Sequence, residues 1–212
     1  MYIYEDDCMS KIILHKGDLP QDIEFSGSVG VDTETMGLNL HRDRLCLVQL
    51  GDGKGHAHLV QIIPGQDCPN LKRVLTDKNL LKIFHFARFD VAKIYNDLGV
   101  MVAPVYCTKI ASKLCRTCAP YHGLKNLCYD LLGISVSKEQ QCSDWGAEKL
   151  TKDQCNYAAS DVLYLHALKE KLDELLKREN RYEIAMECFD FLPTRAKLDL
   201  LDFEEPDIFS HH

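Results

Sequence analysis

Four acidic residues and one tyrosine are the side chains of this sequence whose types and spacing best fit catalysis. Asp32 and Glu34 stand two residues apart inside an apolar run, Asp90 lies near the middle of the chain, and Tyr157 and Asp161 stand four residues apart. Carboxylates bind hard divalent cations, and two such ions roughly 3.5–4 Å apart can stabilise the attacking and leaving oxygens of a phosphoryl displacement. The set therefore predicts metal-dependent hydrolysis of a phosphodiester, provided that the five side chains meet in space.

The spacing within each pair predicts that its two side chains share a face. Side chains alternate along a strand, so Asp32 and Glu34 would project to one side and Thr33 to the other. Residues four apart on a helix are neighbours, which would place Tyr157 beside Asp161. Carboxylates are costly to bury among apolar residues, and bound cations would remove that cost. An unperturbed tyrosine titrates at about 10, so the phenol would need those cations nearby before it could act on an attacking water.

Each motif also has an ordinary explanation when it is considered alone. Two acids at a strand end can simply face solvent, and a tyrosine with an aspartate one turn away is common at the boundary of a helix. Asp90 falls in the first turn of an expected helix, where the helix dipole favours a carboxylate without any metal. The metal site is therefore favoured by the combination and not by a single motif.

Strands dominate the first half of the sequence and must position the early acids. Three segments rich in β-branched and aliphatic residues, separated by polar turns, predict an antiparallel meander over 28–34, 45–50 and 57–63. Further elements are then expected: a helix over 69–76, a strand over 81–85, a helix over 88–98 ended by Gly99, and a short strand around Val105. The first two acids would lie on the first strand of the meander.

Helices dominate the second half. From Thr108 onward, apolar residues recur at intervals of three and four, which predicts amphipathic helices. Thr151 is a good N-cap, and one apolar stripe predicts a single long helix over 151–177. A last helix over 181–191 is expected to stop before Pro193, because proline interrupts the helical hydrogen bonds. An acidic tail with apolar residues follows.

Composition and charge limit the partners. With 212 residues, 46% of them hydrophobic, the chain can bury one substantial core, so a single domain is expected. The formal net charge is −7, whereas proteins that bind long duplexes usually present a basic face. A nucleic-acid ligand would therefore be short or single-stranded. Because no signal peptide and no apolar stretch of ~20 residues stands out, we expect a soluble cytoplasmic protein with no membrane partner.

Ten cysteines are scattered along the chain. Several lie in apolar periodic segments, where cysteine behaves as a small hydrophobic residue, and we expect reduced thiols. Cys115 and Cys118 have the spacing of a zinc or redox site, but no second pair matches it. Two cysteines near a helix end explain the motif better than a zinc module does.

Three segments, taken in order, resemble a known family. Val31-Asp-Thr-Glu-Thr35, His85-Phe-Ala-Arg-Phe-Asp90 and Tyr157-Ala-Ala-Ser-Asp-Val-Leu-Tyr164 are similar to the three motifs of the ribonuclease D-like 3′–5′ exonucleases, the tyrosine branch of the four-acid superfamily. The resemblance runs from about residue 25 to residue 178. Three further segments, the ending of the chain and the absence of a C-terminal helical RNA-binding domain are most similar to the short oligoribonucleases of the nano-RNase C branch. The segments are Asn39-Leu-His-Arg-Asp-Arg-Leu45, His122-Gly-Leu-Lys-Asn-Leu127 and Ser143-Asp-Trp145, and the ending runs from Leu192-Pro-Thr-Arg195 to Asp207-Ile-Phe209.

The resemblance implies an α/β fold: a ribonuclease H-like mixed sheet whose first three strands are antiparallel, flanked by helices in a single domain. It places the 3′–5′ exonuclease domain at residues 25–192, with an N-terminal segment, 1–24, packed on that domain. A C-terminal tail, 193–212, would lie at a subunit interface. A homo-oligomer, a ring of eight subunits, is expected for such a protein.

The resemblance also implies roles for individual residues. Tyr157 would position the hydrolytic water, and two Mg²⁺ or Mn²⁺ ions would be held by Asp32, Glu34, Asp90 and Asp161. The substrates would be short RNA oligonucleotides, down to dinucleotides, released as 5′-mononucleotides. Substrate contacts are expected from Thr33, Leu38, His85, Phe89 and Lys125. Among these, Leu38 would wedge against the terminal bases.

Two positions depart from the pattern of many ribonuclease D relatives. Phe86 stands where those relatives carry an asparagine, and Cys107 stands where they often carry an aspartate, so substrate binding is expected to differ in detail. Lys125 belongs to a cationic group that could bind a 5′-phosphate, together with Lys109, Lys113 and His122. Solvated helix faces explain this group equally well.

Two other functions would fit the same fold. A broader exonuclease that trims the 3′ ends of structured RNA or of DNA would stay active as its substrates grow longer. A catalytically silent nucleotide-binding or scaffold protein would typically have lost one of the acids, and all four are present here. The sequence therefore favours an exoribonuclease for short substrates.

Overall fold

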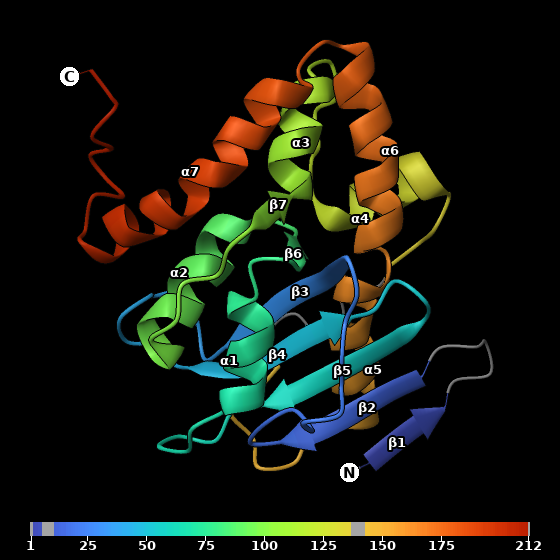
Figure 1. The fold of residues 1–212 in the computed structure, drawn as a ribbon, viewed down its shortest axis with the longest axis vertical. Helices are drawn as coiled ribbons and strands as arrows, with labels where there is room; N and C mark the ends of the chain where they lie inside the picture. The colour runs from blue at the N-terminus through green and yellow to red at the C-terminus, as the bar shows by residue number, and fades with distance from the viewer. Residues whose placement is uncertain (1, 6–10, 137–142, 212) are drawn as a thin grey trace.

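The computed structural model describes residues 2–5, 11–136 and 143–211. Within them, one mixed sheet runs through the molecule in the order β1-β2-β5-β4-β3-β6-β7 (Figure 1). Its strands are β1 (Tyr2–Glu5), β2 (Lys11–Lys16), β3 (Ser28–Thr35), β4 (Leu45–Gly51), β5 (His56–Gln61), β6 (Leu81–Phe84) and β7 (Val105–Cys107).

The centre of the sheet is the antiparallel meander that the sequence predicted. β4 pairs antiparallel with both β3 and β5. β6 and β7 continue the sheet in parallel beyond β3. On the other side β2 adds in parallel to β5, and β1 pairs antiparallel with β2. The N-terminal residues that were expected to pack on the domain thus supply the two outer strands of its sheet.

The helices of the described residues follow the predicted order. They are α1 (Pro69–Thr76), α2 (Ala87–Leu98), α3 (Thr108–Cys115), α4 (Leu124–Leu127), α5 (Lys152–Leu163), α6 (Leu165–Arg178) and α7 (Tyr182–Leu200), with a π-helical stretch, η1 (Cys128–Leu132), directly after α4. The bounds predicted for α1 are confirmed. α2 ends as predicted at Gly99, whose φ of 72° lets its N–H donate to the Tyr95 carbonyl.

The long helix predicted over 151–177 is wrong in its middle. It begins as predicted, since the Thr151 hydroxyl accepts from the Gln154 N–H and the Gln154 side chain accepts from the Thr151 N–H. At Tyr164, with φ −101° and ψ −3°, the helix is interrupted between α5 and α6. α5 packs against β3, β4 and β5, whereas α6 packs mainly against α3. The apolar spacing continues through the break, so the sequence pattern did not reveal it.

The helix end predicted before Pro193 is also wrong. α7 continues to Leu200 with Pro193 inside it. Proline removes one helical hydrogen bond. However, Phe189, Leu192 and Ala196 are buried, and α7 packs against α2 along this side. Burial of the apolar face outweighs the lost hydrogen bond.

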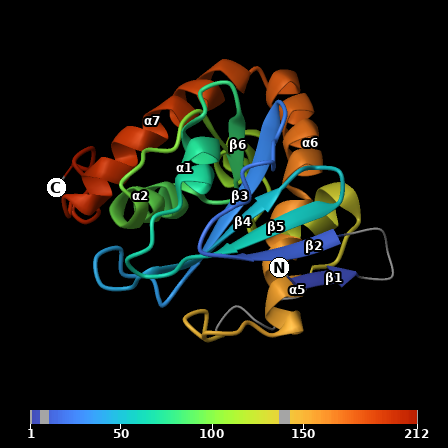
Figure 2. The ribbon, with the colours of Figure 1, turned by 60° about the horizontal axis from the view of Figure 1, so that its bottom comes forward.

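Helices cover both faces of the sheet. Figures 1 and 2 show α5 on one face of the meander and α1 on the other, with α2 and α7 side by side. Because both faces are covered, β4 is buried along its whole length. Among the described residues, no helix combines the length and the apolar composition that crossing a bilayer requires.

Two glycines set the distance between α5 and the sheet. Gly30 on β3 and Gly51 on β4 pair across the two strands. A Cβ atom at either position would lie only 2.9 Å from the carbonyl oxygen of Val162 on α5. The missing side chains therefore let the end of α5 lie directly on β4 and on β3, the strand that carries Asp32 and Glu34.

A buried group of ion pairs, which we call the Asp199 cluster, ties the C-terminal tail to α2 and α7. Arg88 donates through Nε and Nη2 to the two carboxylate oxygens of Asp199, at 2.6 and 2.7 Å. Arg195 donates to Asp199 Oδ1 at 2.9 Å, and its other nitrogens bond to Asp207 and to the Phe203 carbonyl. Asp199 is 5% exposed, so its charge is neutralised entirely within the protein.

Candidate active site

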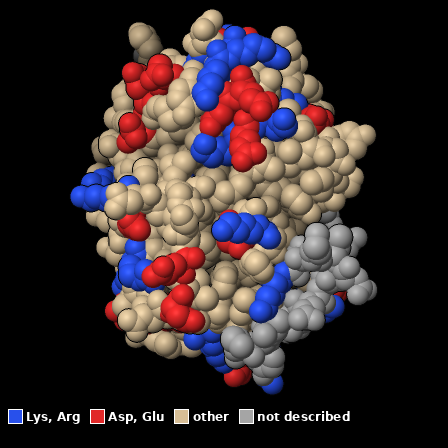
Figure 3. All heavy atoms as spheres, turned by 45° about the vertical axis from the view of Figure 1, so that its right-hand side comes forward, with Lys and Arg blue, Asp and Glu red and all other residues tan. Residues whose placement is uncertain are grey.

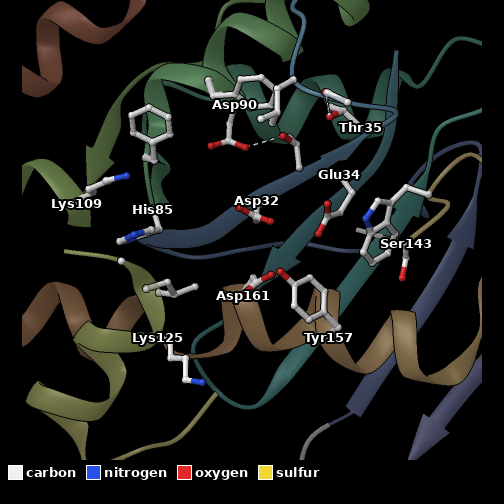
Figure 4. A pocket seen from close by; sticks show the side chains of 18 of the residues that line it. Asp32, Glu34, Thr35, His85, Asp90, Lys109, Lys125, Ser143, Tyr157 and Asp161 are labelled. Carbon is white, nitrogen blue, oxygen red and sulfur yellow. Dashed lines mark hydrogen bonds between the residues drawn. The ribbon is translucent and has the colours of Figure 1, made fainter. Parts of the chain in front are cut away.

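The residues predicted to do chemistry line one cavity of about 690 Å³. β3 contributes two acids, α2 contributes one, and α5 contributes an acid and the tyrosine: Asp32, Glu34, Asp90, Asp161 and Tyr157. Figure 4 shows their polar ends directed toward one another from these three elements. The fold therefore joins segments from the beginning, middle and end of the chain at a single place.

Three of the acids form a tight group. One carboxylate oxygen from each of Asp32, Glu34 and Asp161 lies within 4.8 Å of the others. The two strand residues project to the same side, and the approach of α5 at Gly30 and Gly51 brings Asp161 over them. Oxygen atoms at this spacing can be shared by hard divalent cations.

Asp90 lies beside this group and has a different partner. The Thr33 hydroxyl donates to Asp90 Oδ1 at 2.6 Å, and both residues are buried. Thr33, which the sequence predicted as a substrate contact, lines the cavity, and its hydroxyl also fixes the orientation of the Asp90 carboxylate. Asp90 is close enough to raise the pKa of Asp32 through the repulsion of like charges.

The four acids repel one another, and burial reduces their contact with solvent. Burial, followed by the charges of Asp161 and Asp90, raises the pKa of Glu34 to about 9. Burial likewise raises the pKa of Asp90 and of Asp161 to about 7, against hydrogen bonds with Thr33 and Tyr157 that lower them. Burial also holds the pKa of Asp32 well above its usual range.

None of the ion pairs between described residues places a lysine or an arginine on these four acids. A bound metal ion stabilises carboxylates that gather without a cationic side chain, because its charge offsets their repulsion. The donor set, made only of carboxylate oxygens, suits Mg²⁺ or Mn²⁺ better than a soft metal. The residues present therefore fit a divalent metal centre.

Gln49 is a polar residue of this site that the sequence analysis missed. It pairs with Asp32 across β3 and β4, is fully buried, and donates from Nε2 to Asp32 Oδ2 at 3.4 Å. Its Oε1 is buried without a hydrogen-bond partner among the described residues. The available signal was a single glutamine inside the otherwise apolar strand over 45–50. The amide of Gln49, on the neighbouring strand β4, therefore helps to hold the Asp32 carboxylate in place.

Tyr157 is oriented by its surroundings. Its hydroxyl is hydrogen-bonded with Asp161, and its ring lies 6.0 Å from the ring of Trp145, centroid to centroid, in a tilted arrangement. Burial, followed by the charges of Asp161, Glu34 and Asp32, raises the pKa of the phenol. The hydroxyl therefore stays protonated until cations neutralise the acids around it.

His85 is held as one neutral tautomer. Its Nδ1 lies 2.8 Å from the Thr108 hydroxyl, which in turn donates to the Phe84 carbonyl at 3.1 Å. Because the hydroxyl proton is used there, Nδ1 must be the donor and Nε2 is left as an acceptor. Burial, followed by the charge of Lys109, lowers the pKa of His85 to about 3. The ring thus presents an acceptor at neutral pH.

The other predicted substrate contacts also reach the cavity. Leu38, Phe89 and Lys125 line it. The side chain of Leu38 is 83% exposed, so its apolar surface is open to contact with a ligand. Of the proposed cationic group, Lys109 and Lys125 line the cavity. His122 is hydrogen-bonded to Ser112 and, like Lys113, does not line it.

Charge on the surface and the cysteine pair bear on the alternatives. On the face drawn in Figure 3, Lys and Arg side chains are interspersed with Asp and Glu and form no continuous band. Such a face lacks the continuous positive charge that binding of a long duplex requires.

The cysteine pair bears on the zinc alternative. Cys115 is buried and Cys118 is exposed, both as free thiols. In the described residues the acid group is the candidate metal cluster found, which gives no support to a zinc module.

The family becomes clear when the chain is compared with known proteins. Residues 5–177 match the model of a family described as 3′–5′ exonuclease. The chain belongs to this exonuclease family. It is 34% identical over 160 residues to ribonuclease D of Sphingobium indicum, covering 75% of this chain and 41% of that protein. It is 33% identical over 154 residues to DNA polymerase I of Aquifex aeolicus, covering 73% and 25%. The chain thus spans less than half the length of these curated relatives.

Solved structures agree with the exonuclease fold. NrnC of Brucella melitensis is 53% identical with a TM-score of 0.92, and the match covers 95% of this chain and 98% of that one. Ribonuclease D of Escherichia coli is 26% identical with a TM-score of 0.71, covering 81% and 45%. Related structures hold Brucella NrnC with Mg²⁺ and with pGG. The ribonuclease D-like resemblance and the ribonuclease H-like mixed sheet are both confirmed.

Proposed function

We propose that this exonuclease is an oligoribonuclease that removes 5′-mononucleotides from the 3′ ends of short RNAs, down to dinucleotides. The observation that carries the proposal is the group of three carboxylates within 4.8 Å of one another in a cavity of about 690 Å³. Small-molecule sites commonly measure ~300–1,000 Å³. The bound pGG in the similar Brucella NrnC supports the same substrate class.

The metal centre would be built by the four acids. Asp32, Glu34, Asp90 and Asp161 would hold two Mg²⁺ or Mn²⁺ ions, which when bound polarise the phosphate and lower the pKa of a bound water. Thr33 fixes the carboxylate of Asp90 through its hydroxyl. The Mg²⁺ bound in Brucella NrnC supports this choice of metal.

Tyr157 would orient the attacking water. Its hydroxyl sits at the edge of the acid group, hydrogen-bonded with Asp161, and Trp145 packs against its ring. Water attacks the phosphorus, the bond to the 3′ oxygen of the preceding nucleotide breaks, and that oxygen takes up a proton. A phenol held this firmly restricts the direction of attack, which contributes to the rate by orientation.

Substrate recognition would come from the rest of the cavity wall. The Nε2 acceptor of His85 can receive a hydrogen bond from a ribose hydroxyl, which DNA lacks at the 2′ position. Leu38 and Phe89 offer apolar surface to bases, and Lys125 offers a positive charge to a phosphate. Together these contacts favour a short RNA.

A second candidate is a broader exonuclease that trims structured RNA or DNA ends. The similar ribonuclease D of Escherichia coli, described as an exoribonuclease involved in structured RNA processing, and the match to DNA polymerase I of Aquifex aeolicus favour it. A time course with labelled RNAs of about two to twenty nucleotides, with Mg²⁺ or with excess chelator, decides between the two. We expect dinucleotides to be cleared fastest and chelator to stop the reaction. Equal rates at every length would replace the first proposal with the second.

We also propose a cytoplasmic homo-oligomer, an octamer, in which the tail lies at a subunit interface. The tail exposes several large apolar side chains, which a neighbouring subunit would cover. They are Leu201, Phe203, Ile208 and Phe209, at 66, 45, 49 and 70% exposure. Sedimentation of a Leu201→Glu, Phe209→Glu variant should show smaller particles than the unmodified protein, and an unchanged mass would exclude this interface.

A further inference from the structure

Phe86 occupies a backbone conformation that does not suit its side chain. It precedes α2 with φ 71° and ψ 44°, in the left-handed region. The other non-glycine residues with positive φ in the described chain are Asn180 and Asp202. Asparagine and aspartate tolerate this region, whereas a bulky aromatic residue there is strained. Strained residues of this kind cluster at active sites and ligand-binding sites.

Burial does not explain the phenylalanine. Its side chain is 45% exposed and lines the cavity. The ammonium group of Lys109 lies 4.2 Å from the centroid of the ring. A cation against an aromatic ring is attracted by its electron-rich face and limits the ring's freedom. The result is an aromatic surface that is held in place yet still open to the cavity.

The position of this surface follows from the direction of the reaction. Figure 4 shows His85 and Lys109 on one side of the acids and Tyr157 on the other. In an in-line displacement, the attacking water and the leaving oxygen stand on opposite sides of the phosphorus. If Tyr157 orients the water, the nucleotide that keeps the leaving 3′ oxygen extends toward His85 and Lys109. The ring of Phe86, in contact with Lys109, lies on that path.

We propose that Phe86 stacks on the base of the nucleotide on the 5′ side of the cleaved bond, with Lys109 holding the ring. This inference rests on the proposed function and specifies one of its binding contacts. Stacking on an aromatic ring tolerates any base but increases with the area of the base. Purines at this position therefore bind more tightly than pyrimidines.

The test compares Phe86→Asn with Phe86→Tyr on two dinucleotides. One is pGpG, and the other is its analogue with an abasic ribose in the 5′ position. Phe86→Asn should raise the KM for pGpG by roughly 5- to 100-fold, leave kcat nearly unchanged, and leave the KM for the abasic analogue as in the unmodified protein. Phe86→Tyr keeps the ring and should behave like the unmodified protein. Because asparagine suits the left-handed conformation, Phe86→Asn should not lower the melting temperature.

Three results would overturn the proposal. These are an unchanged KM of Phe86→Asn for pGpG, an equal rise for the abasic analogue, and a fall in melting temperature that Phe86→Tyr does not share. Binding of both dinucleotides, measured by calorimetry with Ca²⁺ in place of Mg²⁺, separates this inference from the proposed function. If pGpG binds through Phe86 and is not hydrolysed once Mg²⁺ is supplied, the proposed function is wrong and the stacking contact stands.

Discussion

Two regions of this molecule bury carboxylates, and they differ in whether arginine side chains neutralise the charge. In the Asp199 cluster, one carboxylate at 5% exposure is matched by Arg88 and Arg195. In the cavity, Asp90 at 4% exposure and three partly buried acids have no lysine or arginine paired with them in the described chain. Both regions lie against α2, so position in the fold alone does not explain the difference.

The contrast separates a structural use of buried charge from a chemical one. Where the protein supplies the cation itself, the ion pairs connect α2, α7 and the tail, and the site is complete. Where the acids are left without a counter-charge, their pKa values rise and the energy of that repulsion is available to bind a metal ion. Substitutions in the two regions should therefore separate activity from stability.

The largest effect is expected from Asp161→Asn. It keeps the size of the side chain but removes one carboxylate of the proposed metal centre, so hydrolysis should fall by about a thousandfold or more, as when essential catalytic groups are removed. Stability without metal should be equal or higher, because one of the repelling charges is gone. Turnover of a labelled dinucleotide and thermal melting in chelator measure both. Glu170→Gln, on the exposed surface of α6, is the matched control.

Asp199→Asn is expected to have the opposite result, a loss of stability with little change in activity. Two arginines then lose their buried counter-charge, which should destabilise the fold by about 3 kcal/mol, typical of breaking a buried pair. The kcat at a temperature where the variant is folded should stay near that of the unmodified protein. Urea unfolding and initial rates provide the comparison. If Asp199→Asn lost activity while keeping its stability, the two clusters would not be functionally distinct.

Tyr157→Phe is expected to have the next largest effect. The ring and its packing on Trp145 remain, and only the hydroxyl is lost, which we propose orients the water. We expect kcat to fall by about 100-fold, at the lower end of the range for groups that act on a proton or water. KM should change little. A proportionate rise in KM with unchanged kcat would mean that the hydroxyl binds substrate and does not act on the water.

The smallest effect is a dependence of stability on pH and metal. In the unfolded chain carboxyl protons leave near pH 4, whereas in the folded protein Asp90 and Asp161 keep theirs until about pH 7 and Glu34 until about pH 9. The metal-free protein should therefore lose stability as pH rises through this interval. Excess Mg²⁺ should raise the melting temperature by more at pH 8 than at pH 6. A stabilisation independent of pH would mean that these acids do not bind the metal.

Local pattern was enough for much of the fold and for the choice of functional residues. The meander, α1 and the caps at Thr151 and Gly99 depend on short segments, whose alternation and turn residues are visible in sequence. Asp32 and Glu34 share a face because they lie two apart on one strand. The proximity of Asp161 to them could be predicted only by adding a family resemblance to the pattern. The chemical roles of these residues stay predictions.

Features that depend on packing between distant segments could not be predicted. The break at Tyr164 and the passage of α7 through Pro193 are decided by the surfaces that the helices cover. The hydrogen bond from the Thr33 hydroxyl to Asp90 joins positions 57 residues apart, and the sequence around neither residue indicates it. Gln49 is an exception. A single polar residue inside an apolar strand needs hydrogen-bond partners outside that strand, so the sequence alone could have indicated a role for its side chain.

The geometry of this site depends on two glycines outside it, Gly30 and Gly51. Neither residue has a functional group, yet both leave the room in which α5 approaches the sheet. One added methyl group would push the end of that helix outward and move Asp161 away from its partners on β3. Substitutions at these two positions, neither of which lines the cavity, should therefore weaken or abolish catalysis.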